Sequence, residues 1–387
     1  MATPSSNPPL GKGNAITSYF FFSLLICVLL VLSIDCKQSI DIANHSGVFN
    51  NDTLLAVRGN DLKRTVVTAT MNAPFERGKN MVWCGTFQLA WNEACTLVGE
   101  DLHFDPEPPI VAELDQKAFR KDDLDTASYV ALAGFVKDGI HQKIRQSLHE
   151  KFGVEAKSSY IPPESLTPRP QDLVAYAYLF KNLEFAAPFE RQEKPLRFGS
   201  WEISAFGMGD PKRAHEQMAP QVLILDYIGP DDFVIELKTK SQTDRLILAK
   251  VQPKANLAET VAEVKNRSNS AKPQTCLPED KLAVPRFNFD IVQTYNQIEG
   301  LKLVVQNLKV AGDLQVLSAV QDIRFQMDEK GVILKSESHV TFACAKAPSP
   351  RYTMIFDKPF LVFLERTNAT TPYLAMWIDN SELLAPW

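Results

Sequence analysis

The sequence lacks the short motifs on which many enzyme classes depend. It has no G-x-S-x-G, G-x-x-x-x-G-K-S/T, G-x-G-x-x-G or H-E-x-x-H pattern. His141 and His149 fall on one predicted helix about two turns apart, too far to share one metal ion. None of the six cysteines forms a C-x-x-C pair, so neither zinc nor thioredoxin chemistry is indicated. We therefore expect no enzyme activity, no metal and no cofactor.

A basic cluster is also missing. The chain has 41 Lys and Arg against 46 Asp and Glu, a net charge of −5. Nucleic-acid affinity depends chiefly on neutralising phosphates, so this balance argues against such a partner. The composition is 45% hydrophobic and 22% charged, which excludes a disordered chain and allows a sizeable core.

Near the N-terminus, 19 consecutive residues carry no charge, from Ile16 to Ile34. This length approaches the roughly 20 residues that span a bilayer as a helix, and it exceeds the apolar stretch of a usual secretory signal. We favour an uncleaved membrane anchor over a cleaved signal peptide, and Cys36 leaves a lipoprotein signal as a weaker alternative. We expect a signal or anchor at 1–36, a linker at 37–62 and a folded body at 63–387 outside the cytoplasm.

Four N-x-S/T triplets would accept N-linked glycans if the host glycosylates secreted chains. They begin at Asn44, Asn51, Asn266 and Asn368.

Apolar periodicity predicts helices mainly in the first half of the chain. We expect a buried helix over 81–98, a second within the segment that begins at Asp125 and ends near Gly153, and a third near 256–264. Later segments are short and β-rich. The predicted strands are 173–180, 221–229, 232–238, 245–251, 323–327, 332–342, 360–366 and 373–379. This order predicts an α+β fold with several β-sheets.

Six segments, in the right order, resemble motifs of the serpin family. They are NMVWCGTFQLAW (80–91), LVAYAYLFKNLEFAAPF (173–189), VLILDYIG (222–229), VPRFNFD (284–290), QDIRFQMDEKG (321–331) and DKPFLVFLERTNATTPYLAMWI (357–378). Asn80, Lys181 and Phe189 match family positions, whereas Cys84 replaces a serine and Phe185 a tryptophan. The span from Asn80 to Lys181 is shorter than in serpins, which implies that some helices are missing or shortened there.

The resemblance implies a reactive loop after Gly331. In inhibitory serpins a protease cleaves this loop, which then inserts into the main sheet as a new strand. Insertion needs a hinge of small residues, roughly T-E-A-A-A-A-T. Here the hinge consists of Gly331, Val332, Ile333, Leu334, Lys335, Ser336 and Glu337. These residues are bulky and charged, and their alternation is typical of a strand that already lies in a sheet. Asp328–Gly331 has the composition of a turn, so we expect a hairpin over 323–338.

If the loop is exposed, counting forward and counting back along the family's spacing place the scissile bond at two different positions. One count places it near Ala345–Lys346, and the other near Pro348–Ser349.

We therefore expect a serpin-like, membrane-tethered or secreted protein that does not inhibit proteases and works as a binding, carrier or structural module. The alternative is a serpin-type suicide inhibitor of an extracellular serine or cysteine protease. The partner would accordingly be an unknown ligand or such a protease.

Overall fold

The structure is a computed structural model that describes residues 54–152, 164–167, 169–208, 216–270, 272–307, 314–332 and 351–387. The chain divides into two units, 1–44 and 45–387, and all described residues belong to the second. The predicted anchor at 16–34 therefore lies outside the described residues. Within the described part, no helix has the length and apolarity to cross a membrane.

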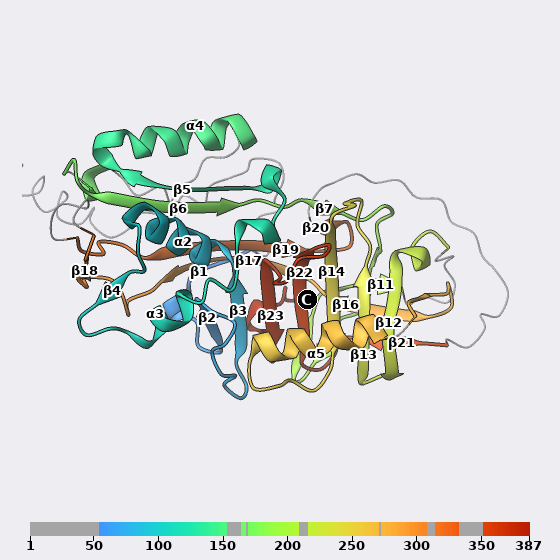
Figure 1. The fold of residues 1–387 in the computed structure, drawn as a ribbon. Helices are drawn as coiled ribbons and strands as arrows, with labels where there is room; N and C mark the ends of the chain where they lie inside the picture. The colour runs from blue at the N-terminus through green and yellow to red at the C-terminus, as the bar shows by residue number, and fades with distance from the viewer. Residues whose placement is uncertain are drawn as a thin grey trace, which may run out of the picture. The chain divides into compact units, whose positions relative to one another are not determined.

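An eight-stranded sheet is built largely from the C-terminal half of the chain. Its order is β15-β12-β13-β14-β22-β23-β3-β2. The bounds are β15 (Gln274–Thr275), β12 (Val222–Gly229), β13 (Asp232–Leu237), β14 (Asp244–Lys250), β22 (Phe360–Arg366), β23 (Leu374–Ile378), β3 (Asn80–Cys84) and β2 (Thr65–Thr68). Helix α5 (Leu257–Ser270) contacts this sheet, as Figure 1 shows. The predicted strands at 221–229, 232–238, 245–251, 360–366 and 373–379 and the helix near 256–264 are all confirmed.

The structure also contains a three-stranded sheet and a two-stranded sheet. The first has the order β1-β17-β19, with β1 (Leu55–Arg58), β17 (Phe287–Thr294) and β19 (Val320–Met327). The second pairs β5 (Tyr129–Phe135) with β6 (Leu173–Leu179) in antiparallel register. No ladder joins β6 to β19 within the described residues.

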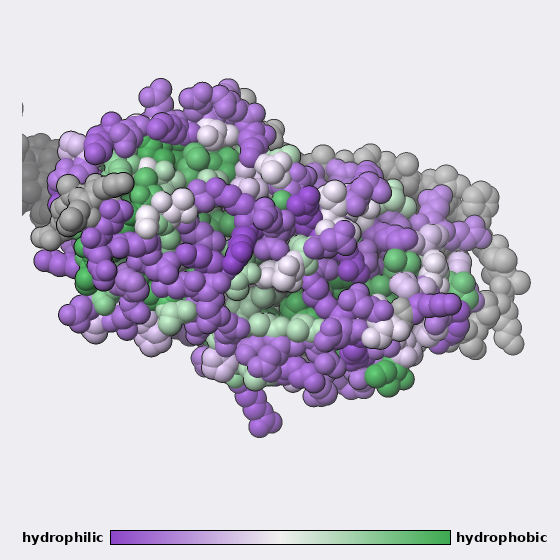
Figure 2. All heavy atoms as spheres, viewed as in Figure 1, coloured by the Kyte–Doolittle hydropathy of each residue, from purple (hydrophilic) through white to green (hydrophobic). Residues whose placement is uncertain are grey.

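Helices cover both faces of the β5–β6 pair (Figure 1). Ile140, Ile144 and Leu148 of α4 (Ile140–Phe152) pack against Val174 and Tyr176 of β6. The alternate β6 positions turn the other way, because side chains of a strand alternate between faces. Leu173 and Ala175 pack against the cluster that contains Phe87 and Trp91 of α2 (Thr86–Val98). In Figure 2, polar side chains coat α4 and apolar ones gather beneath it.

A four-stranded sheet, β21-β16-β11-β8, completes the main architecture. It contains β21 (Thr353–Ile355), β16 (Lys281–Pro285), β11 (Ala205–Met208) and β8 (Glu190–Arg191). β21 pairs in parallel with β16 and is the first strand after the undescribed segment 333–350. The strands on either side of the segment that contains the predicted scissile bonds thus belong to different sheets.

The predicted helix over 81–98 is wrong in its first part. Asn80–Cys84 is strand β3, and the helix begins at Thr86. All five β3 residues are buried within the eight-stranded sheet. A strand buried on both faces shows a continuous apolar run, which periodicity alone does not separate from a buried helix.

The second helix prediction is also wrong in its first part, because Tyr129–Phe135 is strand β5 and the helix begins at Ile140. Pairing with β6, whose partner residues lie 38 to 50 positions away in sequence, decides this conformation.

The linker boundary at residue 62 is placed too late. Leu55–Arg58 forms β1, which pairs with Phe289–Val292 of β17, so the folded body includes residues that we predicted as linker.

Candidate functional site

The N-terminal border of segment 333–350 is a junction of three chain segments. The turn Asp328–Gly331 is confirmed, since the N–H of each end residue donates to the carbonyl of the other at 3.1 and 3.2 Å. The next strand, β20 (Gly331–Val332), pairs with β7 (Leu183–Glu184). The first arm of the predicted hairpin, 323–327, is the end of β19, and Val332 pairs with β7, whereas residues 333–338 lie outside the described part.

Backbone bonds tie the turn to the chain that follows β7. The N–H of Phe185 donates to the carbonyl of Lys330 at 3.1 Å, and the N–H of Phe189 to that of Glu329 at 2.7 Å. The ring of Phe185 packs edge-on against Phe189 with centroids 4.9 Å apart. Arg286, the residue that follows β16, adds an ion pair of 3.2 Å with Glu329 of the turn.

Position 331 requires glycine because of both its backbone conformation and the atoms that surround it. Its φ of +122° lies in a region that L side chains rarely adopt. A Cβ at this position would lie 2.6 Å from the carbonyl oxygen of Leu183 and 2.7 Å from the nitrogen of Phe185. Both neighbours are backbone atoms, so neither moves without disturbing the strand pairing.

The C-terminal border of the same segment is held by a buried carboxylate. Asp280 is 1% exposed, and its two oxygens accept the N–H groups of Tyr352 at 2.7 Å and Leu277 at 2.9 Å. The guanidinium of Arg351 lies 3.9 Å away. Asp280 therefore fixes the chain at the point where it enters β21.

Lys250 holds the segment just after β21. Its buried Nζ donates to the carbonyls of Ile355 and Pro230, at 3.0 and 3.1 Å. It also contacts the carboxylates of Asp357 at 2.6 Å and Asp231 at 2.7 Å. Lys250 and Lys358 together lower the pKa of Asp231 to about 2.

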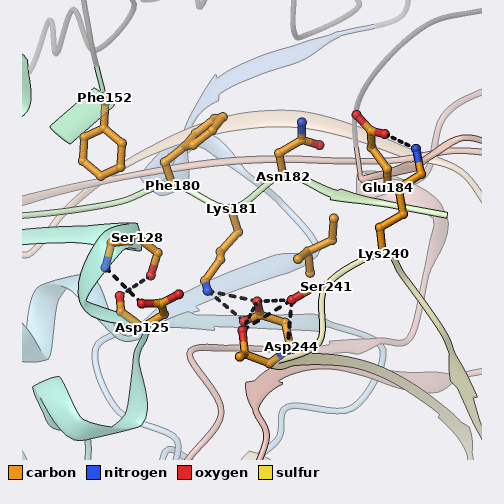
Figure 3. A pocket seen from close by; sticks show the side chains of 13 residues that line it. Asp125, Ser128, Phe152, Phe180, Lys181, Asn182, Glu184, Lys240, Ser241 and Asp244 are labelled. Atoms are coloured by element: carbon orange, nitrogen blue, oxygen red, sulfur yellow. Dashed lines mark hydrogen bonds and ion pairs between the residues drawn. The ribbon is translucent and has the colours of Figure 1, made fainter. Parts of the chain in front are cut away.

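An open pocket of about 440 Å³ borders β7 on the side of the β5–β6 sheet (Figure 3). Residues from five places in the sequence line it: Asp125, Ala127 and Ser128; Phe152; Phe180 to Glu184; Lys240 and Ser241; and Thr243 and Asp244. Because Leu183 and Glu184 also pair with β20, the pocket and the junction share one strand.

The pocket's base is a closed polar network around Asp244. The ammonium of Lys181 lies 2.8 Å from Asp244, and these side chains are 11% and 4% exposed. Hydroxyl groups of Ser241 and Tyr373 also donate to this carboxylate, at 2.7 and 3.2 Å. Burial and the neighbouring Asp244 raise the pKa of Tyr373 well above its usual value, which keeps its phenol protonated as a donor.

Of the sites predicted from sequence, the structure describes Gly331 and Val332 of the hinge. Hinge residues 333–337 and both predicted scissile bonds, at 345–346 and 348–349, lie outside the described part, as do Asn44 and Asn51. Asn266 on α5 and Asn368 in the β22–β23 loop are exposed, and both stay predicted glycan acceptors.

Within the described residues, Cys95, Asp101 and Asp115 approach one another closely enough to suggest a metal site. Both carboxylates accept hydrogen bonds from neighbouring side chains. Lys117 donates to Asp101 at 2.7 Å and Trp91 to Asp115 at 2.8 Å. Burial raises the pKa of the Cys95 thiol to about 11, so it is protonated at neutral pH. Two of the three side chains are thus held by hydrogen bonds to neighbouring residues.

The sequence did not point to Asp280, Lys250 or Asp244. The one usable pattern was Ser241-Gln242-Thr243-Asp244, whose polar residues are typical of a turn that bonds to itself. The partners of these three residues lie far away in sequence, so local patterns could not reveal them.

The arrangement matches serpins in structure over most of the chain. One similar structure is Serpin48, described as a highly specific serpin of the insect Tenebrio molitor. It shares 12% identity over 77% of this chain and 91% of its own, with a TM-score of 0.45. Another is thyroxine-binding globulin in complex with thyroxine, with 12% identity, 78% and 93% coverage and a TM-score of 0.42. No protein-family model matches the chain, and no curated protein does in sequence. These likenesses concern the fold alone, so the proposals below rest on the chain's own residues.

Proposed function

We propose that this chain is a serpin-like protein that does not trap proteases and acts as a binding module outside the cytoplasm. The observation that carries the proposal is the hinge. Val332, Ile333, Leu334 and Lys335 follow directly on Gly331, where the junction leaves no room even for a methyl group. Side chains of this bulk oppose the rapid passage that strand insertion requires.

The location outside the cytoplasm is part of the same proposal. It rests on the uncharged run from Ile16 to Ile34, which is suited to a membrane anchor. Resistance of the full chain to alkaline carbonate extraction from membranes would support an uncleaved anchor, and a mature N-terminus beyond residue 34 would contradict it.

The competing function is a serpin-type suicide inhibitor of an extracellular protease. One structural observation favours it: β6 and β19 present edges that form no ladder with each other in the described residues. An inserted strand would need two such edges.

The deciding experiment exposes the full chain to trypsin, chymotrypsin, elastase and papain. We expect cleavage within 333–350 without an SDS-stable complex, and a melting temperature within about 5 °C of the intact protein, because no buried area is gained. A covalent complex, or a large rise in melting temperature after cleavage, would overturn the proposal.

A gain-of-function variant sharpens the test. Replacing Val332 by Thr and residues 333–335 by alanine removes the bulk that the proposal holds responsible. We expect this variant to gain thermal stability on cleavage, whereas the parent does not. If neither responds, hinge bulk is not the determining feature.

A further inference from the structure

The pocket beside β7 combines an aromatic wall with a polar base. Phe152 and Phe180 form the wall, with ring centroids 6.3 Å apart and planes at 72° (Figure 3). Both rings are half-buried. An aromatic guest can therefore make edge-to-face contacts with two rings at once. A volume of about 440 Å³ is in the range of small-molecule sites.

Four of the five charged side chains that line the pocket form ion pairs with each other. Lys181 pairs with Asp244 at the base, and Lys240 pairs with Glu184 at 2.6 Å on the rim. Figure 3 shows that the two side chains of each pair point toward one another. An anionic guest would have to displace a carboxylate from a lysine, and a cationic guest a lysine from a carboxylate.

Asp125 is the remaining charged group of the lining. One of its oxygens accepts the N–H of Ala127 at 3.1 Å, in the turn that precedes β5. The ammonium of Lys151 binds the carbonyls of Thr126 and Tyr129 at 2.6 Å and so brings a positive charge to the same turn. The lining thus carries three carboxylates and two ammonium groups, and Lys151 adds a positive charge at the turn of Asp125.

One polar side chain at the rim retains its full hydrogen-bonding capacity. The amide of Asn182 is exposed and has no hydrogen-bond partner among the described residues. It follows Lys181 and Phe180 in the sequence, so it stands beside both the aromatic wall and the ion pair. An amide both donates and accepts, which suits a hydroxyl or a carbonyl group.

From this arrangement we infer that the pocket binds uncharged aromatic molecules that carry a hydroxyl or carbonyl group, with the ring against Phe152 and Phe180 and the polar group at Asn182. This inference rests on the proposed binding function and names its ligand class.

Binding of 1-naphthol to the full chain, followed by titration calorimetry, tests the assignment. We expect one saturable site. Phe180→Ala should weaken binding about fivefold or more, the equivalent of one aromatic contact. Asn182→Ala should weaken it about threefold or more, because one exposed hydrogen bond is lost. Ile228→Ala, which changes a 72% exposed side chain outside the pocket, should leave binding unchanged.

Charged analogues of the probe test the ligand class. 1-Naphthoate and 1-naphthylmethylammonium should bind at least about tenfold more weakly than 1-naphthol, since their charge would lose water and gain only a neutral amide partner at Asn182. Absence of saturable binding, equal binding to the Phe180 and Asn182 variants, or tighter binding of either ion would overturn the inference. Asn182 is exposed, so its variant reports on binding even if the Phe180 variant unfolds. The protease experiment is independent, and failure here leaves its outcome intact.

Discussion

The two borders of segment 333–350 are held by different kinds of interaction. On the N-terminal side, backbone pairing between β20 and β7 and the absence of a side chain at Gly331 define the position. On the C-terminal side, the buried charged groups of Asp280 and Lys250 hold the chain. Charge-assisted bonds in a buried site are about twice as strong as neutral ones. The comparison indicates that the C-terminal border is the firmer, whereas the N-terminal border depends on close backbone fit.

The largest effect is expected at Asp280. Asp280→Ala removes the acceptor for two N–H groups, at Tyr352 and Leu277, and should lower the free energy of unfolding by about 4 kcal/mol. Urea unfolding measures this change. The neighbouring variant Glu279→Ala, which removes a side chain without such bonds, should cost less than about 0.5 kcal/mol. Equal losses for both variants would show that the carboxylate does not anchor this border.

Gly331→Ala should come next, with a loss of about 3 kcal/mol from backbone strain and steric conflict. Gly199→Ala is the matched control, because Gly199 also has a positive φ, +60°, but nothing within 4 Å of a Cβ. It should cost about 1 kcal/mol, the conformational part alone. If the two variants lose the same stability in urea, close packing at the N-terminal border contributes nothing.

A smaller effect of opposite sign is expected at Asp322 on β19, the strand that leads into the N-terminal border. Burial, and then the neighbouring Asp290, raise the pKa of Asp322 well above its usual value. Its contribution to stability is complete below the pKa of the unfolded chain and is lost as pH rises through the raised folded value. Asp322→Asn removes this penalty and should raise the free energy of unfolding at pH 8 by about 1–2 kcal/mol.

The pH profile provides the check for Asp322. Urea unfolding of the parent at pH 5 and pH 8 should show lower stability at the higher pH, and the variant should show a smaller difference. Asp61→Asn, at an exposed position, serves as control and should follow the parent. An unchanged pH dependence in the Asp322 variant would contradict the prediction.

Local sequence patterns predicted the elements whose residue type and period point to one conformation and whose pairing partner lies close by in the sequence. The β22–β23 hairpin was foreseen because two β-rich runs flank a short polar loop, and they pair from Phe360–Ile378 to Leu364–Leu374. Helix α5 was foreseen from its period. The predictions failed for β3 and β5, whose apolar residues are compatible with either a buried strand or a buried helix until a partner strand is known.

The candidate site was less predictable than the fold. The turn at Asp328–Gly331 was recognised from composition, yet β20 pairs with β7, about 148 residues earlier in the chain. Asp280 meets Tyr352 across 72 positions, and Lys181 meets Asp244 across 63. Contacts at such separations depend on which strands become neighbours, and no local pattern encodes this.

The sequence by itself determined the order of the serpin-like segments, most strands of the second half and the bulky hinge after Gly331, because each depends on residue type and short spacing. Only the tertiary structure decided that β6 and β19 belong to different sheets among the described residues and that α4 covers β5 and β6. It also decided that buried charges hold one border of segment 333–350, while the other border relies on backbone fit. The physical reason is that burial and charge pairing act between atoms brought together by folding, whatever their distance along the chain.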